Sequence, residues 1–171
     1  MPRSTSRVLT RVLRVLIAAI LSLLTSLGQP AVARDGVAAA PKAAGVLRLR
    51  SAHSVQVTVE RLKTAVQSKG IRFFDAIDQQ ALGKSAELKI SPSTLVLFGN
   101  PPLGVQFLQS NRYAALDWPV RMLVTEEADG SVWLAWTDFS WLAKRYAIKD
   151  KDAAFKMASA VAASLATEAA K

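Results

Sequence analysis

The sequence predicts an α+β domain built on one antiparallel sheet. Runs rich in β-branched and apolar residues, such as Val46–Ser51, Thr94–Phe98 and Val132–Thr137, alternate unevenly with helical patterns. Repeated strand–helix crossover units, which would indicate a parallel sheet, are absent. The pair Asp129–Gly130 lies between two β-rich runs and is typical of a tight hairpin, which joins antiparallel strands.

Residues 1–33 have the features of a secretory signal peptide. Four arginines between residues 3 and 14 precede a mostly apolar core from Val15 to Leu27, and Ala31-Val32-Ala33 has the pattern of a cleavage site. A membrane span needs roughly 20 apolar residues, and this core is shorter and contains serine and threonine. We therefore expect cleavage before Arg34 and a periplasmic or secreted protein. The alternative is that the segment is kept as an N-terminal anchor.

The composition excludes several classes of function. Cleavage would leave 138 residues, the size of one domain, with no cysteine for a disulfide, a thiolate nucleophile or a lipid anchor. Losing the four signal arginines lowers the net charge from +9 to +5, and the remaining charges are scattered, so we do not expect nucleic-acid binding. With one histidine and no cysteine, no metal site or cofactor is expected. After cleavage, no stable membrane span is expected either.

The first part of the folded domain is predicted from its turn and capping signals. Residues 34–45 are rich in Ala, Gly and Pro and are predicted to be a flexible lead-in, so the domain occupies residues 46–171. After the first strand, Ser54 is predicted to cap a helix that ends near Gly70. The apolar face of this helix carries Val55, Val59, Leu62 and Val66.

The remaining elements are predicted by the same signals. Residues 94–98 are apolar on both faces, which predicts a central strand. The others, in chain order, are a strand over 71–77, a polar connection over 78–87, a strand extension over 88–90, a hairpin over 119–125 and 132–137, a short helix capped by Asp138 or Ser140, and an Ala-rich helix from Asp150 or Asp152.

The apolar run ends abruptly at Gly99-Asn100, before two prolines. Asn100 is predicted to cap a helix that begins at Pro101, because proline suits the first helical position, and Gly99 is predicted to permit the turn. Unpaired amides at such a helix start would suit an anion or a carboxylate. The alternative is that Gly99 and Asn100 only build the turn.

Five short motifs, taken in order, resemble the family known as domain of unknown function 302. They are Thr58–Leu62, Ile77-Asp78, Leu97–Pro101, Ala115–Pro119 and Leu142-Ala143. The resemblance runs from about Leu47 to Ile148. It implies a β-α-β-β-β-β-α fold whose antiparallel sheet is covered on one face by helices. The family's biochemical role is not established, so the resemblance implies no reaction.

The matched positions and their neighbours define the candidate ligand-binding residues. One of them departs from the family, which usually has a histidine where this chain has Gln79. A glutamine does not titrate near neutral pH and is a poor metal ligand, so a function that needed the imidazole would be reduced here to binding. The candidates are Asp78, Gln79, Gly99, Asn100, Asp117 and Trp118.

Three functions are open at this point. We expect an exported domain that binds a small molecule near the Gly99-Asn100 turn and the Asp117-Trp118-Pro119 segment. The second is an enzyme that uses Asp78 or Asp117 as general base. The third is a partner-binding module that forms a homodimer through its sheet, and an exposed apolar sheet face would favour it.

Overall fold

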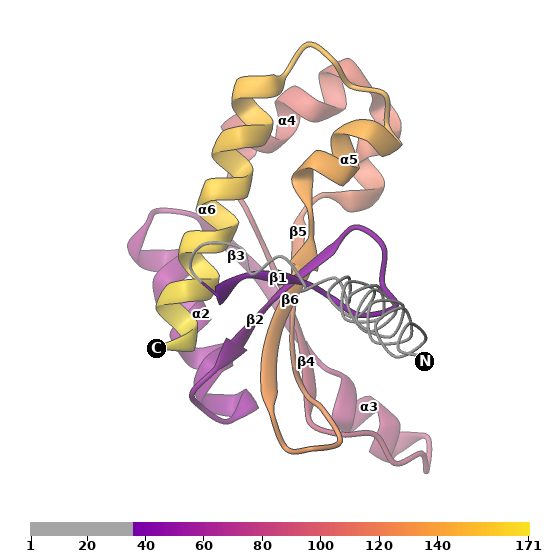
Figure 1. Cartoon of the computed structure of the whole chain (residues 1–171), viewed down its shortest axis with the longest axis vertical. Helices are drawn as coiled ribbons and strands as arrows, with labels where there is room; N and C mark the ends of the chain where they lie inside the picture. Colours follow the sequence, from indigo (N-terminus) through magenta and orange to yellow (C-terminus); the bar gives the residue numbers. More distant parts are fainter. Residues whose placement is uncertain (1–35) are drawn as a thin grey trace, which may run out of the picture. The chain divides into compact units, whose positions relative to one another are not determined.

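The structure is a computed structural model that describes residues 36–171, so the predicted signal peptide and its cleavage site lie outside the described residues (Figure 1). One antiparallel sheet has the strand order β1-β2-β6-β5-β4-β3, which confirms the predicted α+β class. The strands are β1 (Ala38–Ala39), β2 (Val46–Ser51), β3 (Arg72–Asp78), β4 (Ser93–Gly99), β5 (Val120–Glu126) and β6 (Val132–Thr137). The helices are α2 (Val55–Ser68), α3 (Gln79–Ser85), α4 (Pro101–Ser110), the 3₁₀ helix η2 (Arg112–Asp117), α5 (Phe139–Arg145) and α6 (Asp152–Ala170).

Helices cover one face of this sheet. Helix α2 packs against β3, β4 and β5, α6 packs against β2 and β6, and the two helices pack against each other (Figure 1). Alternate residues of each strand point into this layer, where Val96, Met122, Val124 and Leu134 are fully buried. The core therefore lies between the sheet and the long helices, as the resemblance implies.

Several local predictions are confirmed. The Ser54 hydroxyl accepts a hydrogen bond from the Val57 amide at 3.4 Å, and the Asp138 carboxylate caps α5 by accepting from the Ser140 amide at 2.9 Å. Helix α6 begins at Asp152, although no side chain caps it. These signals are local, and they hold because each capping residue reaches its own first turn.

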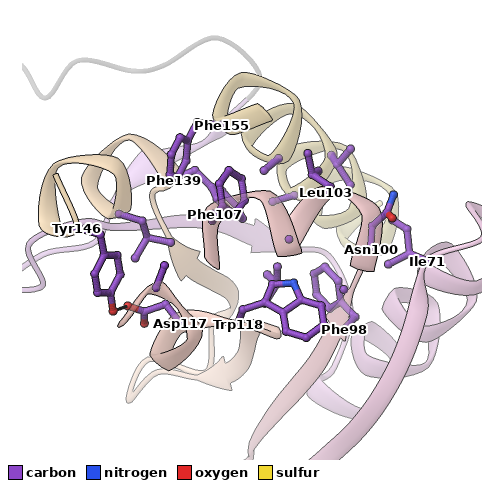
Figure 2. A pocket seen from close by; sticks show the side chains of 18 residues that line it. Ile71, Phe98, Asn100, Leu103, Phe107, Asp117, Trp118, Phe139, Tyr146 and Phe155 are labelled. Carbon is purple, nitrogen blue, oxygen red and sulfur yellow. Dashed lines mark hydrogen bonds between the residues drawn. The ribbon is translucent and has the colours of Figure 1, made fainter. Parts of the chain in front are cut away.

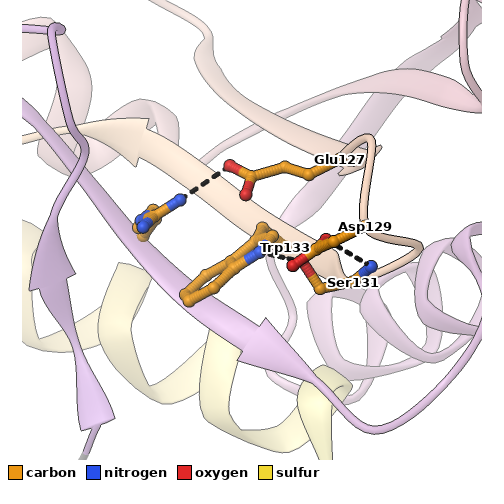
Figure 3. A network of polar contacts seen from close by, with 5 residues as sticks. Glu127, Asp129, Ser131 and Trp133 are labelled. Carbon is orange, nitrogen blue, oxygen red and sulfur yellow. Dashed lines mark hydrogen bonds and ion pairs between the residues drawn. The ribbon is translucent and has the colours of Figure 1, made fainter.

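The β5–β6 hairpin turns where the Asp-Gly pair predicts it, and a polar network holds it (Figure 3). Gly130 has a φ of +78°, a left-handed conformation that suits glycine. Asp129 accepts from the amide and the hydroxyl of Ser131 at 2.9 and 2.6 Å, which lowers the pKa of Asp129. The Trp133 indole donates to the Ser131 hydroxyl at 2.8 Å, so the turn is tied to the sheet.

Three other local predictions are wrong. Part of the lead-in forms the short edge strand β1, which pairs with β2. The polar connection over 78–87 contains helix α3, because Asp78 caps it by accepting from the Ala81 amide at 2.9 Å. Residues 88–90 form no strand; they fold back against α3, where the Leu88 amide donates to the Gly83 carbonyl at 2.8 Å.

Strand β4 is interior but not central, since only β3 lies beyond it. Its residues do alternate between the faces, so that Val96 and Phe98 are buried under the helices while Leu95 and Leu97 point to the other face. The two-sided apolar pattern therefore marks a strand whose second apolar face is not covered by a helix within residues 36–171. Among residues 36–171, no helix is long and apolar enough to cross a membrane.

Candidate functional site: an apolar cavity beneath Trp118

A small apolar cavity lies where the Gly99 end of β4 meets helices α4, α5 and α6 (Figure 2). Its volume is about 50 Å³, roughly a third of the 150 Å³ of an engineered cavity that binds benzene. Phe98, Leu103, Phe107 and Phe155 line it, and the rings of Phe107 and Phe155 stack at a centroid distance of 4.2 Å. The cavity therefore fits an apolar group of a few heavy atoms.

Trp118 lies against the cavity because two glycines leave room for its ring. A Cβ at Gly104 would lie 1.9 Å from the Trp118 Nε1 atom, and a Cβ at Gly99 would lie 3.3 Å from the same ring. Gly104 is in the middle of α4, where glycine costs about 1 kcal/mol relative to alanine, so its place there is explained by the close approach of the indole. Gly99 is likewise explained by this contact, since its φ is not positive and it lies within β4.

The predicted cap by Asn100 is wrong in its detail. Asn100 occupies the N-cap position of α4, but its side chain makes no capping hydrogen bond. Pro101 and Pro102 have no amide hydrogen to give. The next two amides, of Leu103 and Gly104, both donate to the Asn100 carbonyl, at 3.0 and 2.8 Å. No amide in this first turn is left for a ligand, so the predicted anion site is also unsupported.

The polar end of the cavity is formed by Asp117 and Tyr146, which point toward each other in Figure 2. The Tyr146 hydroxyl donates to Asp117 Oδ2 at 2.5 Å. Arg121 forms an ion pair with Asp117 Oδ1, and an Arg145 nitrogen lies 3.7 Å from Oδ2. Burial, followed by the bond to Asp117, raises the pKa of Tyr146, because both favour the neutral phenol.

Two of the six candidates lie elsewhere. Asp78 and Gln79 are at the other end of β4, where Asp78 caps α3 and the Gln79 Oε1 accepts from the Ser93 hydroxyl at 2.7 Å. The carboxylate of Asp78 thus has a structural partner, and Gln79 joins α3 to the sheet. The remaining four, Gly99, Asn100, Asp117 and Trp118, all line the cavity.

Sequence reasoning missed Gly104 and Tyr146. A glycine in the middle of the predicted helix PPLGVQFLQS is a signal of close packing, although it does not say which side chain approaches. Tyr146 lies 29 residues from Asp117 and gives no local signal at all. Only the folded chain brings these two side chains together.

The fold and the site define a small α+β domain with one antiparallel sheet, one helical layer and a small apolar cavity. The family model described as "Domain of unknown function DUF302" matches residues 47–164, and the chain belongs to this family. The solved structure of an uncharacterized conserved DUF302 protein from Bacillus stearothermophilus has the same fold, with a TM-score of 0.67 and 14% identity. The match covers 74% of this chain and 99% of that one.

Curated relatives are similar over a shorter region. "Fluoride-specific ion channel FluC 1" of Brucella suis biovar 1 is 38% identical over 104 residues, which are 61% of this chain and 41% of that protein. "Fluoride-specific ion channel FluC 2" of Brucella melitensis biotype 1 is also 38% identical over 104 residues, which are 38% of its length. This chain therefore spans about two fifths of the curated relatives that it matches.

Proposed function

We propose that this protein is an exported, periplasmic or secreted domain that binds a small molecule through the cavity beneath Trp118. The cavity is the observation that carries the proposal. Interiors are normally packed without voids larger than a water molecule, and here two glycines keep an indole against an open apolar space. An apolar part of the ligand would enter between Phe98, Phe107 and Trp118.

The polar end of the cavity limits the chemistry of this ligand. Asp117 and Tyr146 present oxygen atoms there, and the carboxylate is already paired with Arg121 and Arg145. A hydroxyl or amine on the ligand would donate to these oxygens. The proposed ligand class is therefore a short alkyl chain with a hydrogen-bond donor at one end.

The relatives' names do not lead us to propose fluoride as this ligand. Burying a small anion among apolar side chains is costly without donors to compensate it. The cavity lining is mostly apolar, the carboxylate of Asp117 at its polar end would repel an anion, and the amides of Leu103 and Gly104 at the start of α4 are already bonded.

General-base catalysis has less support than binding. The Asp117 side chain is only 9% exposed, and its two oxygens already contact Tyr146, Arg121 and Arg145. A general base must lie within hydrogen-bond reach of the substrate proton that it removes, and these contacts occupy that position. Asp78 is committed to the α3 cap and lies away from the cavity.

The test compares two alanines on the same helix. Ala162 lines the cavity, whereas Ala166, one turn further along α6, is equally buried and does not line it. Ala162→Val adds two methyl groups to the open space, so we expect unchanged or higher stability. Ala166→Val adds them to a filled core, where overpacking costs about 1–3 kcal/mol.

The binding readout uses 1-propanol, 1-butanol and 1-pentanol as probes. In amide NMR spectra, we expect these alcohols to shift the Gly104 amide and the Trp118 indole resonance of the natural protein. The same titration of Ala162→Val should leave both signals in place. Shifts that persist in Ala162→Val, or an absence of shifts in the natural protein, would overturn the proposal. Native mass spectrometry of exported protein then identifies a retained molecule.

A further inference from the structure

The face of the sheet opposite the helices carries a continuous apolar row. Ile77 on β3 pairs with Leu95 on β4, Leu95 pairs with Leu123 on β5, and Leu123 pairs with Ala135 on β6. All four are partly exposed; Ile77 is on the edge strand β3, whereas the other three are on interior strands. None belongs to the helix-covered core or packs against it. Four neighbouring apolar side chains thus face outward without cover from residues 36–171.

The neighbouring row carries opposite charges on either side of a leucine. Asp75 on β3 pairs with Leu97 on β4, and Leu97 pairs with Arg121 on β5. Asp75 is exposed, and within residues 36–171 its hydrogen-bond partner is the Ala76 amide, which donates to Oδ1 at 2.7 Å. The Arg121 side chain contacts Asp117 through one nitrogen and is 45% exposed, so it keeps free N–H groups.

This arrangement is self-complementary about a two-fold axis that runs along β4 through Leu95 and Leu97. A rotation about that axis places each Asp75 opposite the second copy's Arg121, twice in the dimer. It also places Ile77 opposite Leu123, and each β4 leucine opposite itself. Such isologous contacts are typical of symmetric dimers.

We propose that a second copy of this chain binds face to face to the uncovered sheet face. This face is defined by Ile77, Leu95, Leu97, Leu123, Asp75 and Arg121. The apolar row supplies the buried area, and the two Asp75–Arg121 pairs set the orientation. The three facing strands are about 20 Å long and about 4.8 Å apart, so they cover roughly 300 Å² on each copy, less than the roughly 800 Å² of a standard interface. We therefore expect a weak dimer that forms only at high micromolar concentration.

Another part of the same face is not available to a ligand. The guanidinium of Arg48 lies 3.9 Å from the centre of the Trp133 ring and forms an ion pair with Glu127 at 2.7 Å. The exposed side of this indole is thus covered within the chain (Figure 3). The apolar row is therefore the apolar part of this face that remains open to a partner within residues 36–171.

Sedimentation velocity between about 1 and about 200 µM tests the proposal, in the range expected for a small interface. We expect the natural protein to shift from monomer to dimer over this range, and Leu95→Lys to stay monomeric. Met157→Lys is the matched control, because Met157 is 58% exposed on α6, away from the proposed face. It should dimerise normally, and circular dichroism confirms that both variants fold.

Single cysteines test the axis itself, because the chain has no natural cysteine. Facing sheets lie about 10 Å apart, so a short bis-maleimide should link Leu97→Cys to its own copy in the dimer. Met157→Cys should not be linked. Asp75→Arg should raise the dissociation constant about tenfold. A natural protein that stays monomeric at the highest concentration, a dimer that Leu95→Lys leaves intact, or equal linking at both cysteines would overturn the proposal.

Discussion

At the Gly99 end of β4, the chain packs an indole, six phenylalanine or leucine side chains and two glycines around an apolar cavity. At the Ser93 end of the same strand, about 20 Å away, the contacts are polar, and helix α3 has no buried residue. Asp78 caps α3 and Gln79 accepts from Ser93, so both side chains act within the scaffold. The Asp78-Gln79 segment thus lies at the end of β4 that lacks the cavity.

This contrast explains why the six candidate residues separate into two groups. The Ile-Asp-Gln segment stands out in sequence because it is polar after an apolar strand, but that pattern is what a helix cap requires. The residues that shape the cavity are glycines and aromatic side chains, which look like ordinary core residues. The position of a residue in a motif alone therefore does not tell whether it caps a helix or shapes the cavity. Four variants test this comparison.

The largest effect is expected at Gly104. In an ordinary helix, Gly→Ala stabilises by about 1 kcal/mol, whereas Gly104→Ala places a methyl group into the Trp118 ring and should cost about 3 kcal/mol. Urea unfolding measures the change in the free energy of unfolding that Gly104→Ala causes. In a Trp118→Ala background the clash is absent, so the same substitution should become neutral or stabilising. An equal loss in both backgrounds would show that the indole does not explain this glycine.

Tyr146→Phe should cost about 2 kcal/mol at pH 7, since it removes the donor to a nearly buried carboxylate. The pKa of Tyr146 is raised in the folded state, so its contribution is complete below the unfolded value of about 10 and is lost as the pH rises through the folded value. Urea midpoints of both proteins should therefore converge above about pH 10. A difference that stays constant with pH would contradict this role.

Asp78→Ala should cost about 1 kcal/mol locally, because it removes the cap of α3. No side chain of α3 is buried, so the loss should appear as faster hydrogen exchange of the Ala81 amide rather than as global unfolding. Asp78→Asn keeps a capping oxygen and should restore most of the protection. Unchanged exchange of the Ala81 amide in Asp78→Ala would show that the Asp78 carboxylate does not stabilise α3.

The smallest effect is expected for Asn100→Ala. An effective cap contributes about 0.5–2 kcal/mol, but the Asn100 side chain makes no capping bond, so the change should stay below about 0.5 kcal/mol. The urea midpoint is the measurement, with Ser54→Ala as the control that loses a real cap. A loss near 1 kcal/mol for Asn100→Ala would mean that its side chain does bond within the first turn.

The sequence by itself determined the features that depend on neighbouring residues. The hairpin at Asp129–Gly130, the caps at Ser54 and Asp138, and the helix start at Pro101 need only a few adjacent side chains and amides, so their patterns predict them correctly. The family resemblance predicted, in addition, that helices cover only one face of the sheet. The sequence also predicts the N-cap position of Asn100 correctly, but not the missing capping bond. Pro102 has no amide hydrogen, and the Leu103 amide donates to the Asn100 carbonyl instead of to its side chain.

The tertiary structure alone decided where the cavity lies and which residues serve it. Asp117 meets Tyr146 from 29 residues away, and Trp118 enters the space that Gly104 leaves on a different element. Which face of β4 the helices cover was likewise undecided, because Leu95 and Leu97 are as apolar as Val96 and Phe98. Such contacts depend on packing between elements distant in the chain, and residue-to-residue periodicity does not report which elements meet.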